Sequence, residues 1–212
     1  MKTADLINAL AAEPPPPALR LGRRVALALV FGAAVSAVLF MAALGPRADI
    51  NAAAHTLRFD LKFVDTLALL LPSALLAVRL LRPDARPGAL VAALVAPLVL
   101  LGGAVIVELI VTPADLWMTR LIGTNALHCL TMIPLMSIPP LAALIYAMRA
   151  GAQSHPALTG ALAGAAAAGV AATIYATNCT DDSPLFVASW YPLATLIVVA
   201  AGALAGRKWL QW

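Results

Sequence analysis

Six hydrophobic stretches, each about as long as a bilayer is thick, fill nearly all of this chain of 212 residues. A hydrocarbon core about 30 Å thick takes roughly 20 apolar residues in an α-helix. Because lipid offers no partner for unpaired backbone groups, we expect each stretch to be a transmembrane helix. The predicted spans are 24–44, 63–81, 89–111, 126–148, 157–177 and 184–205.

The composition agrees with this fold class and excludes a soluble domain. Charged residues are 11% of the chain, whereas a soluble protein carries about 25%. Long continuous apolar runs, rather than short alternating ones, argue against a β-barrel. We therefore predict an all-α polytopic membrane protein with an N-terminal tail (1–23), a six-helix domain (24–206) and a short C-terminus (207–212). The dispersed basic residues argue against direct nucleic-acid binding and favour contact with the lipid bilayer.

Lysine and arginine residues set the predicted orientation, because loops rich in them stay in the cytoplasm. The tail, the second and fourth loops and the C-terminus share ten of these residues, and the other three loops share four. Both termini are therefore predicted to be cytoplasmic (N-in, C-in), and 45–62, 112–125 and 178–183 are predicted to face outward.

Small residues and prolines predict features of the helix packing. Gly160 and Gly164, like Gly202 and Gly206, are one helical turn apart, and such pairs let two backbones approach closely. The fourth span holds three prolines, which predict a kink or an unwound section there; they are Pro134, Pro139 and Pro140.

Catalysis finds no support in the sequence, which lacks the common hydrolase, metalloprotease and phosphate-binding motifs. We predict that the chain is not an enzyme and has no cofactor. Two carboxylates lie near the predicted outer ends of their spans, Asp65 and Glu108. We expect them to reach water or to pair with Arg58, Lys62 or Arg120.

Two cysteines, Cys129 and Cys179, are both predicted to lie at the outer face. They are candidates for a disulfide or redox pair, for a metal-responsive site together with His128, or for inert apolar side chains. Other groups that the topology would gather around them are His55, Glu108, Asp181 and Asp182.

The N-terminal tail reads MKTADLINALAAE and is followed by Pro14 to Pro17. Thr3 is a good helix cap, and Leu6, Ile7 and Leu10 share one face at helical spacing. The four prolines favour an extended spacer. We predict a short amphipathic helix held away from the membrane, which would gain order by docking on a cytoplasmic partner.

Several segments together resemble a known family. They are the tail with its proline spacer, IPLMSIPPLAALIYAMRAGA (133–152), ALTGALAGAAAAGVAATIYATNCTDDSPLFVASWY (157–191) and the ending GALAGRKWLQW. The chain resembles the membrane-embedded anti-sigma factors called negative regulator of sigma F (NrsF type). The stretch 175–191 is the most specific part of this resemblance.

The resemblance implies a bacterial inner-membrane protein that sequesters an extracytoplasmic-function sigma factor until a stress signal releases it. It assigns sigma-factor contact to the segment around Asp5, Leu6, Ile7 and Leu10. It makes Cys129 and Cys179 candidate sensors of redox or heavy-metal stress, so a divalent heavy-metal ion is a possible signal. Two alternatives stay open, a small transporter or channel and a membrane thiol oxidoreductase, although no C-x-x-C motif is present.

Overall fold

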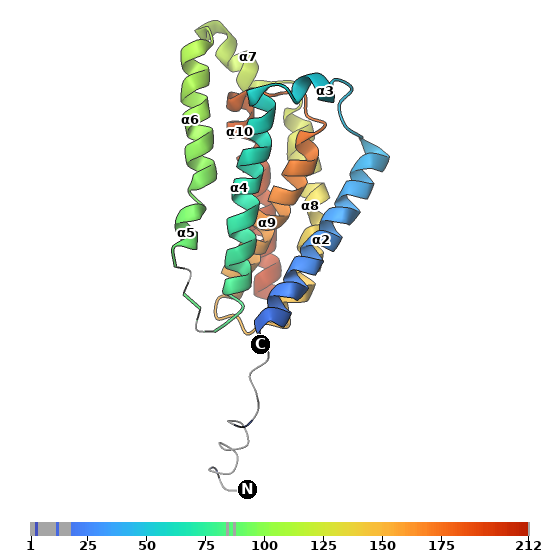
Figure 1. The fold of residues 1–212 in the computed structure, drawn as a ribbon, viewed down its shortest axis with the longest axis vertical. Coiled ribbons are helices and arrows are strands. Elements are labelled where there is room, and N and C mark those ends of the chain that lie inside the picture. Colours follow the sequence, from blue (N-terminus) through green and yellow to red (C-terminus); the bar gives the residue numbers. More distant parts are fainter. Residues whose placement is uncertain (1–2, 4–11, 13–17, 84, 87, 212) are drawn as a thin grey trace.

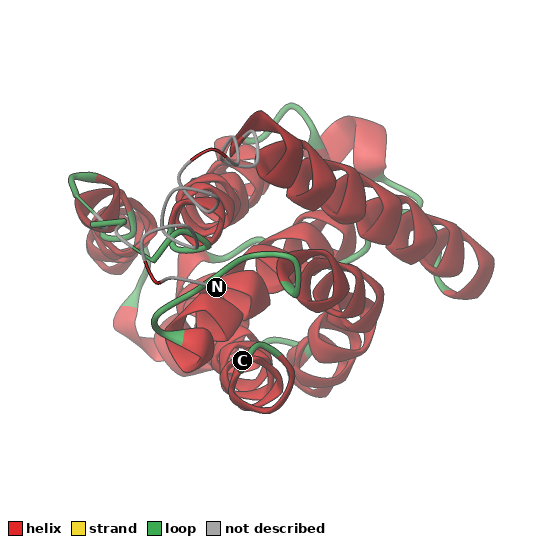
Figure 2. Cartoon of the chain, turned by 90° about the horizontal axis from the view of Figure 1, so that it is seen from below, coloured by secondary structure: helices red, strands yellow, loops and turns green. Residues whose placement is uncertain are grey.

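The computed structural model describes residues 3, 12, 18–83, 85–86 and 88–211. Every regular element in this part of the chain is a helix (Figures 1 and 2). They are α2 (Ala18–Ala43), α3 (Ile50–Ala53), α4 (Leu57–Arg79), α5 (Leu90–Ala93), α6 (Ala96–Val111), η1 (Ala114–Leu116), α7 (Trp117–Ile122), α8 (Ala126–Met148), α9 (Pro156–Ala176) and α10 (Pro184–Trp209).

Six of these helical segments are long and apolar enough to cross a membrane. Large apolar side chains such as Phe31, Val38, Leu98 and Ile110 are more than 60% exposed. Soluble proteins rarely expose so many contiguous apolar groups, so the six apolar helices indicate a membrane protein. The predicted all-α class is therefore confirmed.

The predicted span boundaries agree unevenly with the helices. The fourth span, 126–148, coincides with α8. The second span was wrong at its start, because α4 begins six residues earlier at Leu57, where the side chain of Thr56 caps the helix by accepting from the Phe59 N–H. The last helix continues to Trp209, four residues beyond the predicted end.

The centre of the bundle is α9, which packs against α10, α4, α8 and α2 (Figure 1). In the most apolar stretch of α9, 72% of the residues are buried. In that of the segment 90–111, which contains α6 at the edge of the bundle, 11% are buried. The reason is composition, since α9 consists largely of alanine and glycine and its neighbours can approach its backbone from all sides.

The two glycine pairs pack as predicted, backbone against backbone, between α9 and α10. A Cβ atom added at Gly160 would lie 2.2 Å from the carbonyl oxygen of Gly202, and one added at Gly202 would lie 2.4 Å from that of Gly160. A side chain at either position would force the helices apart.

The prolines of α8 do not unwind it, and the prediction of an unwound section was wrong. Residues 126–148 form one continuous helix. Pro140 has no N–H for the Met136 carbonyl four residues earlier, and the buried Ser36 hydroxyl of α2 donates to that oxygen at 2.7 Å instead. Gly32 lets α2 approach, since a Cβ there would lie 2.3 Å from the Pro140 Cα.

The two ends of the bundle differ chemically, and we name them for their residues. The thiol end carries Cys129 and Cys179, and the basic end is where α2 begins and α10 ends (top and bottom of Figure 1). Each end has its own buried apolar cluster. The described acidic side chains all lie toward the thiol end: Asp49, Asp60, Asp65, Glu108, Asp115, Asp181 and Asp182.

Candidate functional site

Both cysteines are buried in one cluster at the thiol end, as the predicted topology requires. Cys129 lies in the first turn of α8, and Cys179 lies in the loop of residues 177–183 between α9 and α10, which we call the Cys179 loop. Each is fully buried, and both are free thiols in this structure.

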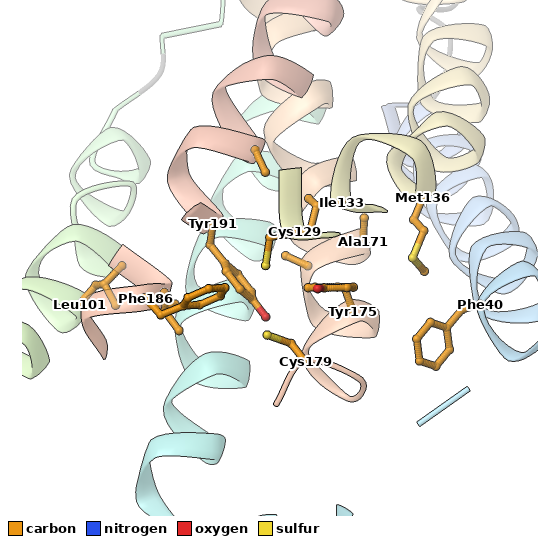
Figure 3. Packing of buried hydrophobic residues seen from close by; sticks show 13 residues of the cluster. Phe40, Leu101, Cys129, Ile133, Met136, Ala171, Tyr175, Cys179, Phe186 and Tyr191 are labelled. Atoms are coloured by element: carbon orange, nitrogen blue, oxygen red, sulfur yellow. The ribbon is translucent and has the colours of Figure 1, made fainter. Parts of the chain in front are cut away.

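Two tyrosines complete the cluster. Tyr175 comes from the last turn of α9 and Tyr191 from α10, and the ring centroids are 6.3 Å apart. Figure 3 shows the side chains of the two cysteines and the two tyrosines pointing toward one another. Both phenol oxygens are buried without a hydrogen-bond partner among the described residues.

The backbone of the Cys179 loop is held by two cations from other elements. The buried Lys62 of α4 donates to the Cys179 carbonyl at 3.0 Å and forms an ion pair with Asp182 at 2.5 Å. Arg47, which follows α2, pairs with the same Asp182 at 2.8 Å and with Asp49 at 2.6 Å. These bonds raise the pKa of Arg47 above its usual value, the hydrogen bond to Asp49 contributing most.

Asp181, also in the Cys179 loop, ties the loop to the start of α8. One of its carboxylate oxygens accepts from the backbone N–H groups of Thr124 and Asn125 at 2.9 and 2.8 Å. Burial alone would raise the pKa of Asp181, but hydrogen bonds from Asn125 and Thr124 lower it overall. Gly123 makes this turn possible with φ of 61°, and a Cβ there would lie 2.4 Å from the Phe186 ring.

The environment of Cys179 favours its thiolate form. The interaction with the Cys129 thiol and the charge of Lys62 lower the pKa of Cys179, although burial acts in the opposite direction. A thiolate is the reactive and metal-binding form of cysteine. The site therefore combines a thiol with a lowered pKa and a second thiol beside it.

The other candidate residues have mixed outcomes. Glu108 pairs with Arg58 at 2.7 Å and with Arg120, and it accepts from Ser183 at the end of the loop, so its predicted pairing is confirmed. Asp65 is 8% exposed and one of its oxygens has no partner, so the expectation that it would reach water or pair was wrong.

Two of the three histidines lie at the margin of the site. The exposed His128 stacks on Tyr175 with centroids 6.4 Å apart, and His55 is exposed in the turn after α3. Among the described residues, no three His, Cys, Asp or Glu side chains gather closely enough to hold a metal ion. The described residues therefore do not assemble the predicted metal site of Cys129, Cys179 and His128.

Sequence reasoning missed Tyr175, Tyr191 and Lys62 as parts of this site. The two tyrosines are the first and last residues of the stretch 175–191, the most specific part of the family resemblance. Their position there was the sequence feature that could have pointed to them. The residues predicted to contact a sigma factor, Asp5, Leu6, Ile7 and Leu10, and the spacer Pro14 to Pro17 lie outside the described residues.

The chain is thus a six-helix membrane bundle with a buried pair of thiols at one end and basic residues at the other. The chain belongs to the family described as negative regulator of sigma F, which matches residues 10–212. A protein of Azospira oryzae named "Probable anti-sigma-F factor NrsF" is 33% identical over 217 residues and covers all of both chains. The "Anti-sigma-F factor NrsF" of Caulobacter vibrioides is also 33% identical, over 221 residues and both full lengths. No solved structure matches the chain.

Proposed function

We propose that this chain is an inner-membrane anti-sigma factor that sequesters an extracytoplasmic-function sigma factor. The observation that carries the proposal is family membership over nearly the whole chain, together with two full-length relatives that are named anti-sigma-F factors. Those names describe regulators rather than enzymes, in keeping with the absence of catalytic motifs from the sequence.

The basic end of the bundle is proposed to face the cytoplasm. It carries nine described lysine and arginine residues against four toward the thiol end: Arg20, Arg23, Arg24, Arg79, Arg82, Arg86, Arg149, Arg207 and Lys208. Positively charged loops are retained in the cytoplasm. This orientation supports a periplasmic position for the thiols and a cytoplasmic one for the tail.

The tail is proposed to hold the sigma factor through Leu6, Ile7 and Leu10, with Asp5 beside them. Changing Leu6 to Asp places a charge on this apolar face, whereas Asn8→Asp adds the same charge to the opposite face of the helix. We expect Leu6→Asp to abolish co-purification of a sigma factor from membranes and to raise transcription of its targets. Asn8→Asp should do neither. Co-purification that survives Leu6→Asp and deletion of 1–13 would refute the proposal.

Cys129 and Cys179 are proposed to receive the inducing signal. Oxidation by a peroxide would remove two electrons and two protons from the thiols, form one S–S bond and reduce the peroxide to water. Alternatively, a soft divalent ion would bind the two thiolates. Either event pulls the Cys179 loop toward α8, and the loop's bonds to Lys62 and Arg47 support transfer of that movement to α4 and α2.

The link to the tail is supported by α2. Asn178 donates to the Gly45 carbonyl at 2.9 Å and Arg47 donates its backbone N–H to the Thr177 carbonyl at 3.0 Å, just beyond the thiol end of α2. From there α2 runs as one helix back to Ala18, within the predicted tail. A displaced loop would therefore act on the helix that carries the sigma-binding segment.

Serine substitutions test the role of the thiols. Cys129→Ser and Cys179→Ser should each keep basal repression and lose the response to peroxide or cadmium, read by a reporter of target transcription. Ser189→Ala, whose hydroxyl bonds only within α10 at 2.9 Å, is the control and should respond like the wild type. A normal response in both cysteine variants would show that the thiols do not receive the signal.

A further inference from the structure

Two grooves run side by side along α8 toward the basic end. The larger, about 1070 Å³, lies between α2 and α8, and the smaller, about 350 Å³, lies between α8 and α10. A ridge of Ala142, Tyr146 and Arg149 borders both. Tyr146 is 78% exposed on this ridge. The two grooves thus form a fork whose branches meet at Arg149.

The length of the larger groove matches one leaflet of a bilayer. Its wall on α8 runs from Pro139 to Arg149 and its wall on α2 from Val35 to Arg24. Ten or eleven helical rises of 1.5 Å each give about 15 Å, and half of a hydrocarbon core is also about 15 Å. The walls between these limits are mainly apolar, formed by Leu27, Phe31 and Ala143 among others.

Positive charge gathers where the grooves reach the basic end. Arg24 and Arg149 border the larger groove. Trp209 lies at the end of the smaller groove, and its ring centroid is 5.4 Å from the Lys208 ammonium nitrogen. Neither arginine has a carboxylate partner among the described residues, since every described acidic side chain lies toward the thiol end. The charge here is therefore complementary to an anionic ligand.

We propose that this fork binds one diacyl phospholipid with an anionic headgroup. The phosphate lies between Arg24 and Arg149, and one acyl chain enters each groove on either side of Tyr146. Arginine is well suited to phosphate because its planar guanidinium donates two hydrogen bonds at once. Tyr146 and Trp209 stand at the level where aromatic side chains meet the headgroups. The proposal depends on the membrane fold and not on the anti-sigma function.

Native mass spectrometry of the full chain tests this site. The protein is purified in mild detergent and offered equal amounts of dioleoyl phosphatidylglycerol and dioleoyl phosphatidylcholine. We expect the wild type to retain phosphatidylglycerol preferentially, as one bound molecule. Each arginine near a lipid phosphate contributes about fivefold in affinity, so the double variant Arg24→Gln/Arg149→Gln should lose retention by roughly 25-fold.

A matched control removes the same charge elsewhere at the basic end. Arg82 and Arg86 line a different groove beyond the end of α4, and Arg82→Gln/Arg86→Gln should change retention less than about twofold. Ala143→Trp should fill the larger groove and reduce retention with the charges intact, whereas Leu98→Trp on the exposed face of α6 should not. Size-exclusion profiles establish that the variants are folded.

Three results would overturn the proposal. They are equal retention of the two lipids by the wild type, equal loss in the two arginine double variants, or a dimer that occupies the fork, seen as a cross-link between copies at Tyr146. If retention of phosphatidylglycerol instead fails only in Arg24→Gln/Arg149→Gln and Ala143→Trp, the site is the one described, whatever the outcome of the sigma-factor experiments.

Discussion

Changing Gly202 to Ala should weaken the bundle, although alanine favours helices. The new Cβ would lie 2.4 Å from the Gly160 carbonyl oxygen and 2.9 Å from the Gly164 Cα. Ordinary contacts begin near 3.5 Å, so α9 and α10 must separate by about 1 Å. Overpacking of this kind costs about 1–3 kcal/mol, and the gain in helix propensity returns about 0.5–1 kcal/mol. We expect a net loss of about 1–2 kcal/mol.

Unfolding by SDS in mixed micelles, followed by tryptophan fluorescence, measures this loss. Gly102→Ala is the matched control, because Gly102 is also helical and has no atom within 4 Å of an added Cβ. The control should be neutral or more stable by up to about 1 kcal/mol. The reasoning is refuted if the two variants change alike, or if Gly202→Ala is as stable as the wild type.

Three further predictions use the same bundle. Ser36→Ala leaves the Met136 carbonyl unpaired and should cost about 1–3 kcal/mol in the same unfolding assay, whereas Ser189→Ala should cost less than 1 kcal/mol; equal effects would contradict this. Glu108→Gln should cost about 1–2 kcal/mol, since its arginine partners are partly solvated, and an unchanged midpoint would count against the ion pairs. Alkylation of Cys179, quantified by mass spectrometry, should reach its midpoint at a lower pH than that of an ordinary cysteine. The stability that its thiolate contributes should be full above the ordinary thiol pKa and lost as the pH falls through the lowered one. A midpoint at the ordinary thiol pKa would contradict the described environment.

Features that depend on local sequence were the ones that could be predicted. The spans follow from hydrophobic runs, and the contact of Gly160 with Gly202 follows from spacing that leaves smooth faces on two helices. The pairing of Glu108 was also expected, because Arg58 and Arg120 were predicted to lie at the same outer end. Predicting such features requires only the rise per residue of a helix and the thickness of a bilayer.

Features that depend on a distant segment were missed. Ser36, a hundred residues away, donates to the Met136 carbonyl, which Pro140 leaves without its usual helical partner. The loop anchor Lys62 and the facing phenols of Tyr175 and Tyr191 come from three different helices. Helical periodicity places each residue on a face of its own helix but does not say which helix that face meets.

The central position of α9 has a consequence for how the protein is made. Four of the six spans precede it in the chain, yet three of those four pack on it. Membrane helices insert first and associate afterwards, so the earlier spans leave the ribosome before their common partner exists. The ordered bundle closes only during synthesis of the last quarter of the polypeptide, and a chain interrupted before Pro156 holds inserted helices that lack the surface around which they assemble.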